Sequence, residues 1–77
     1  TPMYALAVGD LVYSIAQDAQ GAMWFGTNAG VSRFDGKRWR TFGKKEGLLG
    51  DNVYSLAITA KGEVWVGTRR GVSRIGK

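Results

Sequence analysis

The chain of 77 residues contains no cysteine, no histidine and only one proline. The lack of cysteine excludes disulfide bonds and thiolate metal sites. The lack of histidine removes the commonest metal ligand and the usual general base at neutral pH. A chain this short buries a modest fraction of its surface, and it usually needs disulfides, a metal or oligomerisation to be stable. Of these three means of stabilisation, oligomerisation is the one that the composition does not exclude.

Long apolar runs are also missing, since the longest stretches extend over only a few residues. A membrane-spanning helix needs about 20 predominantly apolar residues, so we expect no membrane segment, and we find no signal-peptide pattern. The chain does contain three Trp, three Tyr and three Phe, which argues against disorder. Its net charge of +5 favours acidic partners in general without identifying one.

The most informative feature is an internal repeat with a spacing of 41 residues, the distance from Val12 to Val53. Residues 12–36 (VYSIAQDAQGAMWFGTNAGVSRFDG) align without a gap with residues 53–77 (VYSLAITAKGEVWVGTRRGVSRIGK). Thirteen of the 25 aligned pairs are identical, which indicates a duplication.

Each copy has the pattern of short β-strands joined by glycine-containing turns. In the first copy the predicted strands are VYSIA, AMWFGT, VSRF and RWRTF, and the turns between them are DAQG, NAG and DGK. Asp35-Gly36 is a strong hairpin signal. One full repeat is therefore four antiparallel strands, and its length agrees with the period of roughly 40 to 50 residues that is typical of a β-propeller blade.

The second predicted strand of each copy has consecutive apolar residues, MWF around Trp24 and VWV around Trp65. A sheet with one solvated face would show alternation instead. A blade that lies between two neighbouring blades buries both faces of its inner strands. We therefore expect Trp24 and Trp65 to fill the space between blades, and Gly26 and Gly67 to permit close approach there.

The predicted fold class is all-β, with two four-stranded antiparallel propeller blades that assemble into a multi-chain ring. A β-sandwich or small barrel would explain the strands equally well, but not the self-similarity. Residues 12–52 form the first blade repeat, and residues 53–77 form a second that lacks its fourth strand. Residues 1–11 contain one further strand, MYALAV, which either completes a blade as its fourth strand or begins a truncated third repeat.

The repeated residues resemble the two-component regulator propeller repeat, in which Asp-x-x-Gly-x-x-Trp-x-Gly-Thr precedes a turn and Gly-hydrophobic-Ser-Arg-aromatic. The first copy carries this pattern from Asp18 to Phe34, whereas the second departs from it at Thr59 and Ile75. The residues of the blade signature are Trp24, Gly26, Thr27, Trp65, Gly67 and Thr68. The resemblance implies an extracytoplasmic sensor domain of a bacterial two-component regulator, a class in which some members resemble oligosaccharide sensors.

Candidate ligand-binding residues lie where the two copies differ, because specificity usually resides in variable loops. Asn28-Ala29 in the first copy is replaced by Arg69-Arg70 in the second. Arginine pairs suit the recognition of carboxylate or phosphate, although a solvated turn is the competing interpretation. The repeated Arg33 and Arg74 are expected to bond from blade to blade.

A basic stretch with interleaved aromatic residues follows the first copy. Its members are Lys37, Arg38, Trp39, Arg40, Phe42, Lys44 and Lys45. Such a pattern can bind single-stranded nucleic acid by stacking. We favour a solvated outer strand, because edge-strand charge also blocks unwanted strand pairing. Nucleic acid is therefore not an expected partner.

We expect no catalytic residue, metal or cofactor, since no base is available to activate a hydroxyl group in a triad. The leading hypothesis is a ligand-binding sensor module for an oligosaccharide or a small anionic ligand. The alternative is a minimal or engineered propeller fragment that acts as a self-assembling scaffold without a natural ligand. Propellers have typically four to eight blades, so chains of two blades predict a homo-oligomeric ring, with a trimer favoured over a tetramer.

Overall fold

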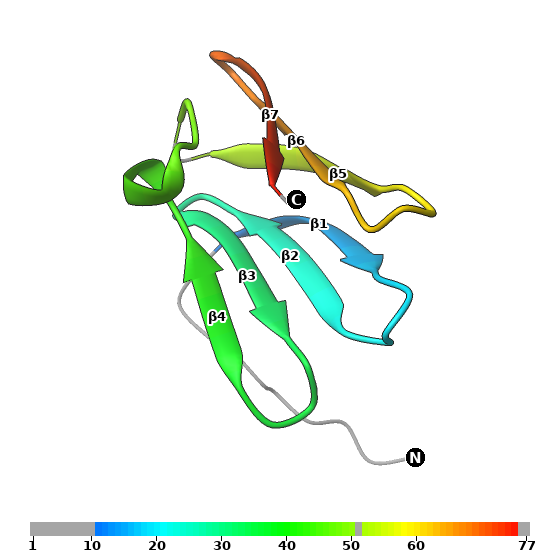
Figure 1. The fold of residues 1–77 in the computed structure, drawn as a ribbon. Helices are drawn as coiled ribbons and strands as arrows, with labels where there is room; N and C mark the ends of the chain where they lie inside the picture. The colour runs from blue at the N-terminus through cyan, green and yellow to red at the C-terminus, as the bar shows by residue number, and fades with distance from the viewer. Residues whose placement is uncertain (1–10, 51, 76–77) are drawn as a thin grey trace.

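A computed structural model describes residues 11–50 and 52–75, and this part of the chain is an all-β structure of two sheets (Figure 1). Its elements are β1 (Val12–Gln17), β2 (Met23–Thr27), β3 (Gly30–Phe34), β4 (Trp39–Phe42), the 3-10 helix η1 (Lys44–Glu46), β5 (Val53–Ile58), β6 (Val64–Thr68) and β7 (Gly71–Ile75). The further strand predicted at residues 3–8 lies outside the described residues.

The two sheets repeat the same antiparallel order, β1-β2-β3-β4 and β5-β6-β7. The four strands predicted in the first copy are therefore confirmed. In the second sheet the described residues give three strands, and β7 pairs there with β6 alone, whereas β3 pairs with both β2 and β4. The sequence predicts a second blade whose fourth strand does not come from residues 53–77, and the second sheet has three strands within the described residues.

The first turn of each blade has the same geometry. In blade one the amide of Gly21 donates to the carbonyl of Asp18 at 3.0 Å, and in blade two the amide of Gly62 donates to the carbonyl of Thr59 at 3.0 Å. Gly21 and Gly62 have φ of 87° and 88°, a region that residues with a side chain rarely adopt. The turns predicted from sequence at these two places are confirmed.

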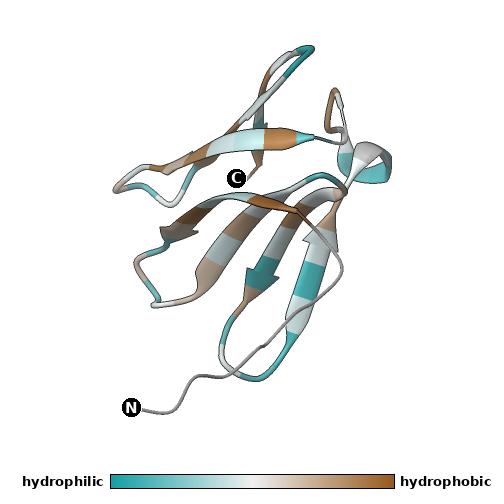
Figure 2. Ribbon diagram, turned by 180° about the vertical axis from the view of Figure 1, so that it is seen from behind, coloured by the Kyte–Doolittle hydropathy of each residue, from teal (hydrophilic) through white to brown (hydrophobic). Residues whose placement is uncertain are grey.

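The core lies between the two sheets and takes one face from each. Its buried side chains are Trp24, Val31 and Phe42 of the first sheet, Val53, Val64 and Val66 of the second, and Leu48 of the connection. The rings of Trp24 and Phe42 stack with centroids 5.6 Å apart. Figure 2 shows apolar segments on both sheets and hydrophilic segments on β4 and at the turns.

The connection that follows β4 contributes a side chain to the core. It contains η1, and the amide of Leu48 donates to the carbonyl of Gly43 at 3.3 Å. Leu48 is buried and belongs to the core cluster. The two adjacent leucines of this connection, Leu48 and Leu49, give no periodic pattern. The burial of Leu48 therefore follows only from the packing of the two sheets.

Candidate functional site

Asp18 is the centre of the side-chain network in blade one. Its Oδ1 accepts hydrogen bonds from the amides of Gln20 at 3.0 Å and Ala22 at 2.9 Å. Its Oδ2 accepts from the indole Nε1 of Trp24 at 2.8 Å and from Nε of Arg33 at 3.2 Å. Burial alone would raise the pKa of Asp18, but these hydrogen bonds outweigh it and hold the pKa below its ordinary value. All the hydrogen bonds described for the Asp18 carboxylate lie within blade one. Arg33 therefore bonds within its own blade, whereas the sequence predicts a bond to the next blade.

In blade two the carboxylate that binds the repeated arginine stands at a different position of the repeat. Thr59 stands where blade one has Asp18, and its Oγ1 accepts only from the amide of Glu63 at 3.1 Å among the backbone amides described. Glu63 stands where blade one has Ala22, and its Oε2 accepts from Nη1 of Arg74 at 2.8 Å. The repeated arginine keeps a carboxylate partner in both blades. In the described part of blade two, nothing replaces Asp18 as an acceptor for the indole of Trp65.

The two threonines of the blade signature shape the turn that follows their strand. Thr27 Oγ1 donates to the carbonyl of Gly30 at 2.9 Å and accepts from the amide of Ala29 at 3.0 Å. Thr68 Oγ1 makes the equivalent bonds to the carbonyl of Gly71 at 3.0 Å and from the amide of Arg70 at 3.2 Å. Each of these two hydroxyl groups bonds to backbone groups of its own turn, so its role is structural.

The two signature glycines permit a close cross-strand contact. A Cβ atom built at Gly26 would meet the hydroxyl of Ser14 on β1, and one at Gly67 would meet the hydroxyl of Ser55 on β5. Gly26 also lies against the neighbouring blade, since the same Cβ would be 2.8 Å from Val53. The signature therefore builds the blade, and the ligand surface has to be sought elsewhere.

The predicted ligand residues lie in the β2–β3 and β6–β7 hairpins. Asn28 is committed to structure, because its Oδ1 accepts from the amide of Leu11 at 3.2 Å and its own amide donates to the carbonyl of Leu11 at 3.1 Å. Arg69 and Arg70 are exposed, and no ion pair involves them within the described residues. Of the three candidates, Arg69 and Arg70 are the two whose side chains make no hydrogen bond or ion pair within residues 11–50 and 52–75.

The fold brings together two tyrosines, Tyr13 and Tyr54, that the sequence patterns did not single out. β1 and β5 lie side by side, and each shows a register shift, between Val12 and Ser14 and between Val53 and Ser55. Such an irregularity re-aims a side chain, and here it falls at Tyr13 and Tyr54, whose ring centroids are 4.9 Å apart. Both rings are exposed. An identical tyrosine in both copies was the signal that could have pointed to them.

The tyrosine pair lies at the same end of the blades as the two hairpins. Val12 pairs with Thr27 and Val53 pairs with Thr68, so the beginnings of β1 and β5 are opposite the residues that enter the β2–β3 and β6–β7 turns. Figure 1 shows η1 on this side as well. We call this region, defined by Tyr13, Tyr54, Arg69 and Arg70, the hairpin end.

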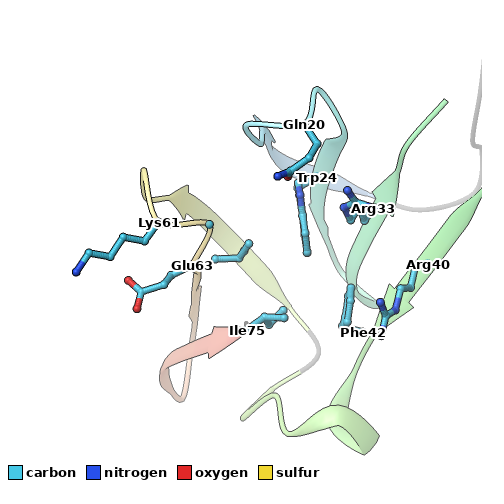
Figure 3. A pocket seen from close by; sticks show the side chains of 10 residues that line it. Gln20, Trp24, Arg33, Arg40, Phe42, Lys61, Glu63 and Ile75 are labelled. Atoms are coloured by element: carbon cyan, nitrogen blue, oxygen red, sulfur yellow. The ribbon is translucent and has the colours of Figure 1, made fainter. Parts of the chain in front are cut away.

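A cleft of about 550 Å³ lies between the outer parts of the two sheets (Figure 3). Its lining residues are Gln20, Trp24, Arg33, Arg40, Phe42, Lys61, Gly62, Glu63, Val64 and Ile75. The guanidinium of Arg40 sits 5.0 Å from the ring centroid of Phe42. The cleft includes none of the predicted ligand residues. The cleft is lined by Ile75 of β7, and the outer edge of β7 has no partner strand among the described residues. The absence of a strand at this edge is enough to explain the cleft.

Residues 11–50 and 52–75 contain no group of three or more His, Cys, Asp or Glu side chains with the arrangement of a metal site. No helix within these ranges is long and apolar enough to cross a membrane.

Two antiparallel sheets of the same strand order, packed face to face and related by a 41-residue repeat, define a pair of β-propeller blades. The chain belongs to the two component regulator propeller family, whose sequence model matches residues 8–29 and 47–70, one match for each repeat. A comparison with curated proteins finds no match. The matched segments begin upstream of β1 and β5, where Gly9-Asp10 and Gly50-Asp51 are identical at the same spacing.

Proposed function

We propose that this blade pair is a non-catalytic recognition module of the sensor type, and that its hairpin end binds an oligosaccharide that carries negative groups. The observation that carries the proposal is the contact between Tyr13 and Tyr54, two exposed rings 4.9 Å apart at equivalent strand irregularities. A single exposed tyrosine is ordinary on a protein surface. Two in contact at repeat-related positions form a continuous aromatic surface.

Tyrosine is well suited to binding a sugar. Its ring offers a large apolar area with few rotatable bonds, and its hydroxyl can donate and accept hydrogen bonds. A sugar ring likewise combines an apolar face with a rim of hydroxyl groups. Neither Tyr13 nor Tyr54 is buried, so both rings have surface to offer.

The charge at the hairpin end favours an acidic sugar over a neutral one. Arg69 and Arg70 are exposed there, and guanidinium groups bind carboxylate and sulfate with paired hydrogen bonds. The net charge of +5 attracts the same class of ligand.

The carboxylates support a non-catalytic role. Asp18, Asp35 and Glu63 each accept hydrogen bonds from the blade itself. Asp35 binds the amides of Lys37 and Arg38 in its turn, which lowers its pKa. A lowered pKa is unfavourable for a general base at neutral pH, so the bonding of Asp18 and Asp35 supports a structural role for both carboxylates.

The test is calorimetric titration with an oligouronate and with a neutral oligosaccharide of the same length. We expect the oligouronate to bind, Tyr13→Ala and Tyr54→Ala to weaken it, and Arg69→Asn with Arg70→Ala to remove the preference for the acidic ligand. Lys37→Asn with Lys61→Asn is the matched control, because it removes the same charge at turns on the opposite end. Equal losses in both charge variants, or full affinity without the tyrosines, would contradict the proposal.

A second candidate function is a self-assembling scaffold without a ligand. It is favoured by the apolar sheet faces that the single chain leaves exposed, which include Trp65 and Val72. A scaffold would bind neither saccharide and would still assemble.

A further inference from the structure

Repeat-related residues differ in exposure according to which face of each sheet is packed. The first sheet packs with the face that contains Trp24 and Val31, and the second packs with its opposite face, which contains Val64 and Val66. Val31 is 0% exposed, whereas its equivalent Val72 is 64% exposed. The two remaining faces are therefore the repeat equivalents of the two that already pack together.

The first unpartnered face, on the second sheet, is the one that contains Trp65 and Val72. Trp65 is 42% exposed and Trp24 is 6% exposed. A Cβ built at Gly26 would contact Val53 of the next blade, whereas the three atoms nearest to one built at Gly67 all belong to Ser55 in its own blade. This face thus has the groove that accepts a neighbouring blade, with no neighbour in the described chain.

The second unpartnered face, on the first sheet, is the one that contains Ile15, Phe25, Phe34 and Trp39, with Val12 at its edge. Val12 is 51% exposed, whereas its equivalent Val53 is 0% exposed against Gly26. Phe25 and Phe34 each contact Trp39, at centroid distances of 5.6 Å and 4.7 Å. These aromatic residues form an apolar surface that already has a defined shape.

We infer that these two faces dock on each other between copies of this chain, head to tail, and close a ring of blades. The occupant of the Trp65 face is the Phe25–Trp39 face of a second copy, with Val12 seated on Gly67 as Val53 is seated on Gly26. The internal interface is the template, because the docking partners are the same repeat positions. This inference goes beyond the proposed ligand site and does not depend on it.

The docking faces differ from each other, so the contact is heterologous. Heterologous contacts close into rings when the rotation between subunits allows, and propellers close at typically four to eight blades. Exposed apolar surfaces of this kind on a small chain mark interaction sites. Three copies of residues 1–77, with two blades each, would give six blades, which lies within this range.

Two variants isolate the two faces. Val72→Glu places a charge on the Trp65 face, and Ile15→Glu places one on the opposite face of blade one. Both residues are more than half exposed in the single chain, so neither change disturbs its core. Ala60→Glu is the matched control, since it adds the same charge at the exposed β5–β6 turn, outside both faces.

The measurement is the solution mass by light scattering at micromolar concentration. We expect the unmodified chain and Ala60→Glu to have the mass of several copies, and each face variant alone to have the mass of one. An equimolar mixture of the two face variants should give a one-to-one dimer, because one intact Trp65 face then meets one intact opposite face. A monomeric unmodified chain, an assembly insensitive to Val72→Glu, or a mixture that stays monomeric would overturn the inference.

Discussion

The two blades have nearly the same signature but place it in different environments. Trp24 is buried, hydrogen-bonded to Asp18 and stacked on Phe42, whereas Trp65 is exposed at the equivalent position. The strand order and the cross-strand pairing are the same. The repeated sequence thus determines the strand order and pairing of each sheet, whereas contact with a neighbouring blade determines whether a signature side chain is buried in a core.

The blades also differ in where they hold their carboxylate. Asp18 binds both the indole and the arginine of its blade, whereas Glu63, at the position of Ala22, binds Arg74 and the hydroxyl of Thr59. Arg74 still lies over its tryptophan, with its guanidinium carbon 5.9 Å from the ring centroid of Trp65. The arginine–carboxylate pair is thus the part of the network that tolerates relocation.

The largest expected difference is between Trp24→Ala and Trp65→Ala. Trp24→Ala should lower the free energy of unfolding by about 3 to 5 kcal/mol, because it removes a buried ring from the core. The loss should be the same at every protein concentration. Trp65→Ala should have a small effect at dilution and a larger one at concentrations where copies assemble, since partner binding stabilises by mass action. Chemical denaturation at several concentrations measures both, and equal, concentration-independent losses would remove the distinction between the blades.

The next effect is expected at Asp18. Asp18→Ala leaves the indole of Trp24 and the guanidinium of Arg33 without their acceptor, and we expect a loss of about 2 to 3 kcal/mol. Thr59→Ala, the matched change in blade two, should cost less than about 1 kcal/mol because it removes a neutral hydrogen bond. Urea unfolding of the two variants gives the comparison. A larger loss of stability for Thr59→Ala than for Asp18→Ala would contradict the structural role assigned to the Asp18 carboxylate.

A smaller difference is expected between two glycines at equivalent turns. Gly30 has φ of 111° and Gly71 has φ of 136°, so alanine is strained at both. At Gly30 the added Cβ would also meet the backbone carbonyl of Phe42, whereas at Gly71 it would lie 3.3 Å from Cδ1 of Leu49, a side chain that can move. We expect Gly30→Ala to cost about 1 to 3 kcal/mol and Gly71→Ala less. Thermal unfolding of both variants tests the order.

The smallest effect is the pH dependence that Asp18 contributes. Its pKa is lower in the folded state, so its contribution to stability is present above the unfolded value of about 3.9 and is lost as the pH falls through the folded value. Acid unfolding of the unmodified chain should therefore be steeper than that of Asp18→Asn. Asp35 shifts in the same direction, so part of the slope should persist in this variant. Identical acid profiles would contradict the role assigned to Asp18.

The strand pattern could be predicted because it follows from local chemistry. Short runs of β-forming residues, glycine turns and the Asp35-Gly36 hairpin signal depend on residues close in sequence, and the 41-residue repeat extends the prediction from one blade to the other. Leu48 could not be assigned to the core in this way, because its burial depends on two sheets that meet around the connection. The bonding of Arg33 to Asp18, rather than to the next blade, required the side-chain positions.

The sequence by itself determined that this chain is a duplicated blade repeat with two tryptophans, two arginines and two threonines at fixed places, since identity at one spacing needs no coordinates. Only the tertiary structure decided that Tyr13 and Tyr54 touch and that Trp24 is covered while Trp65 is exposed. The physical reason is that both outcomes depend on how one sheet packs on another. The two copies share their residues, but within the described part of the chain the neighbouring sheet covers only one face of each.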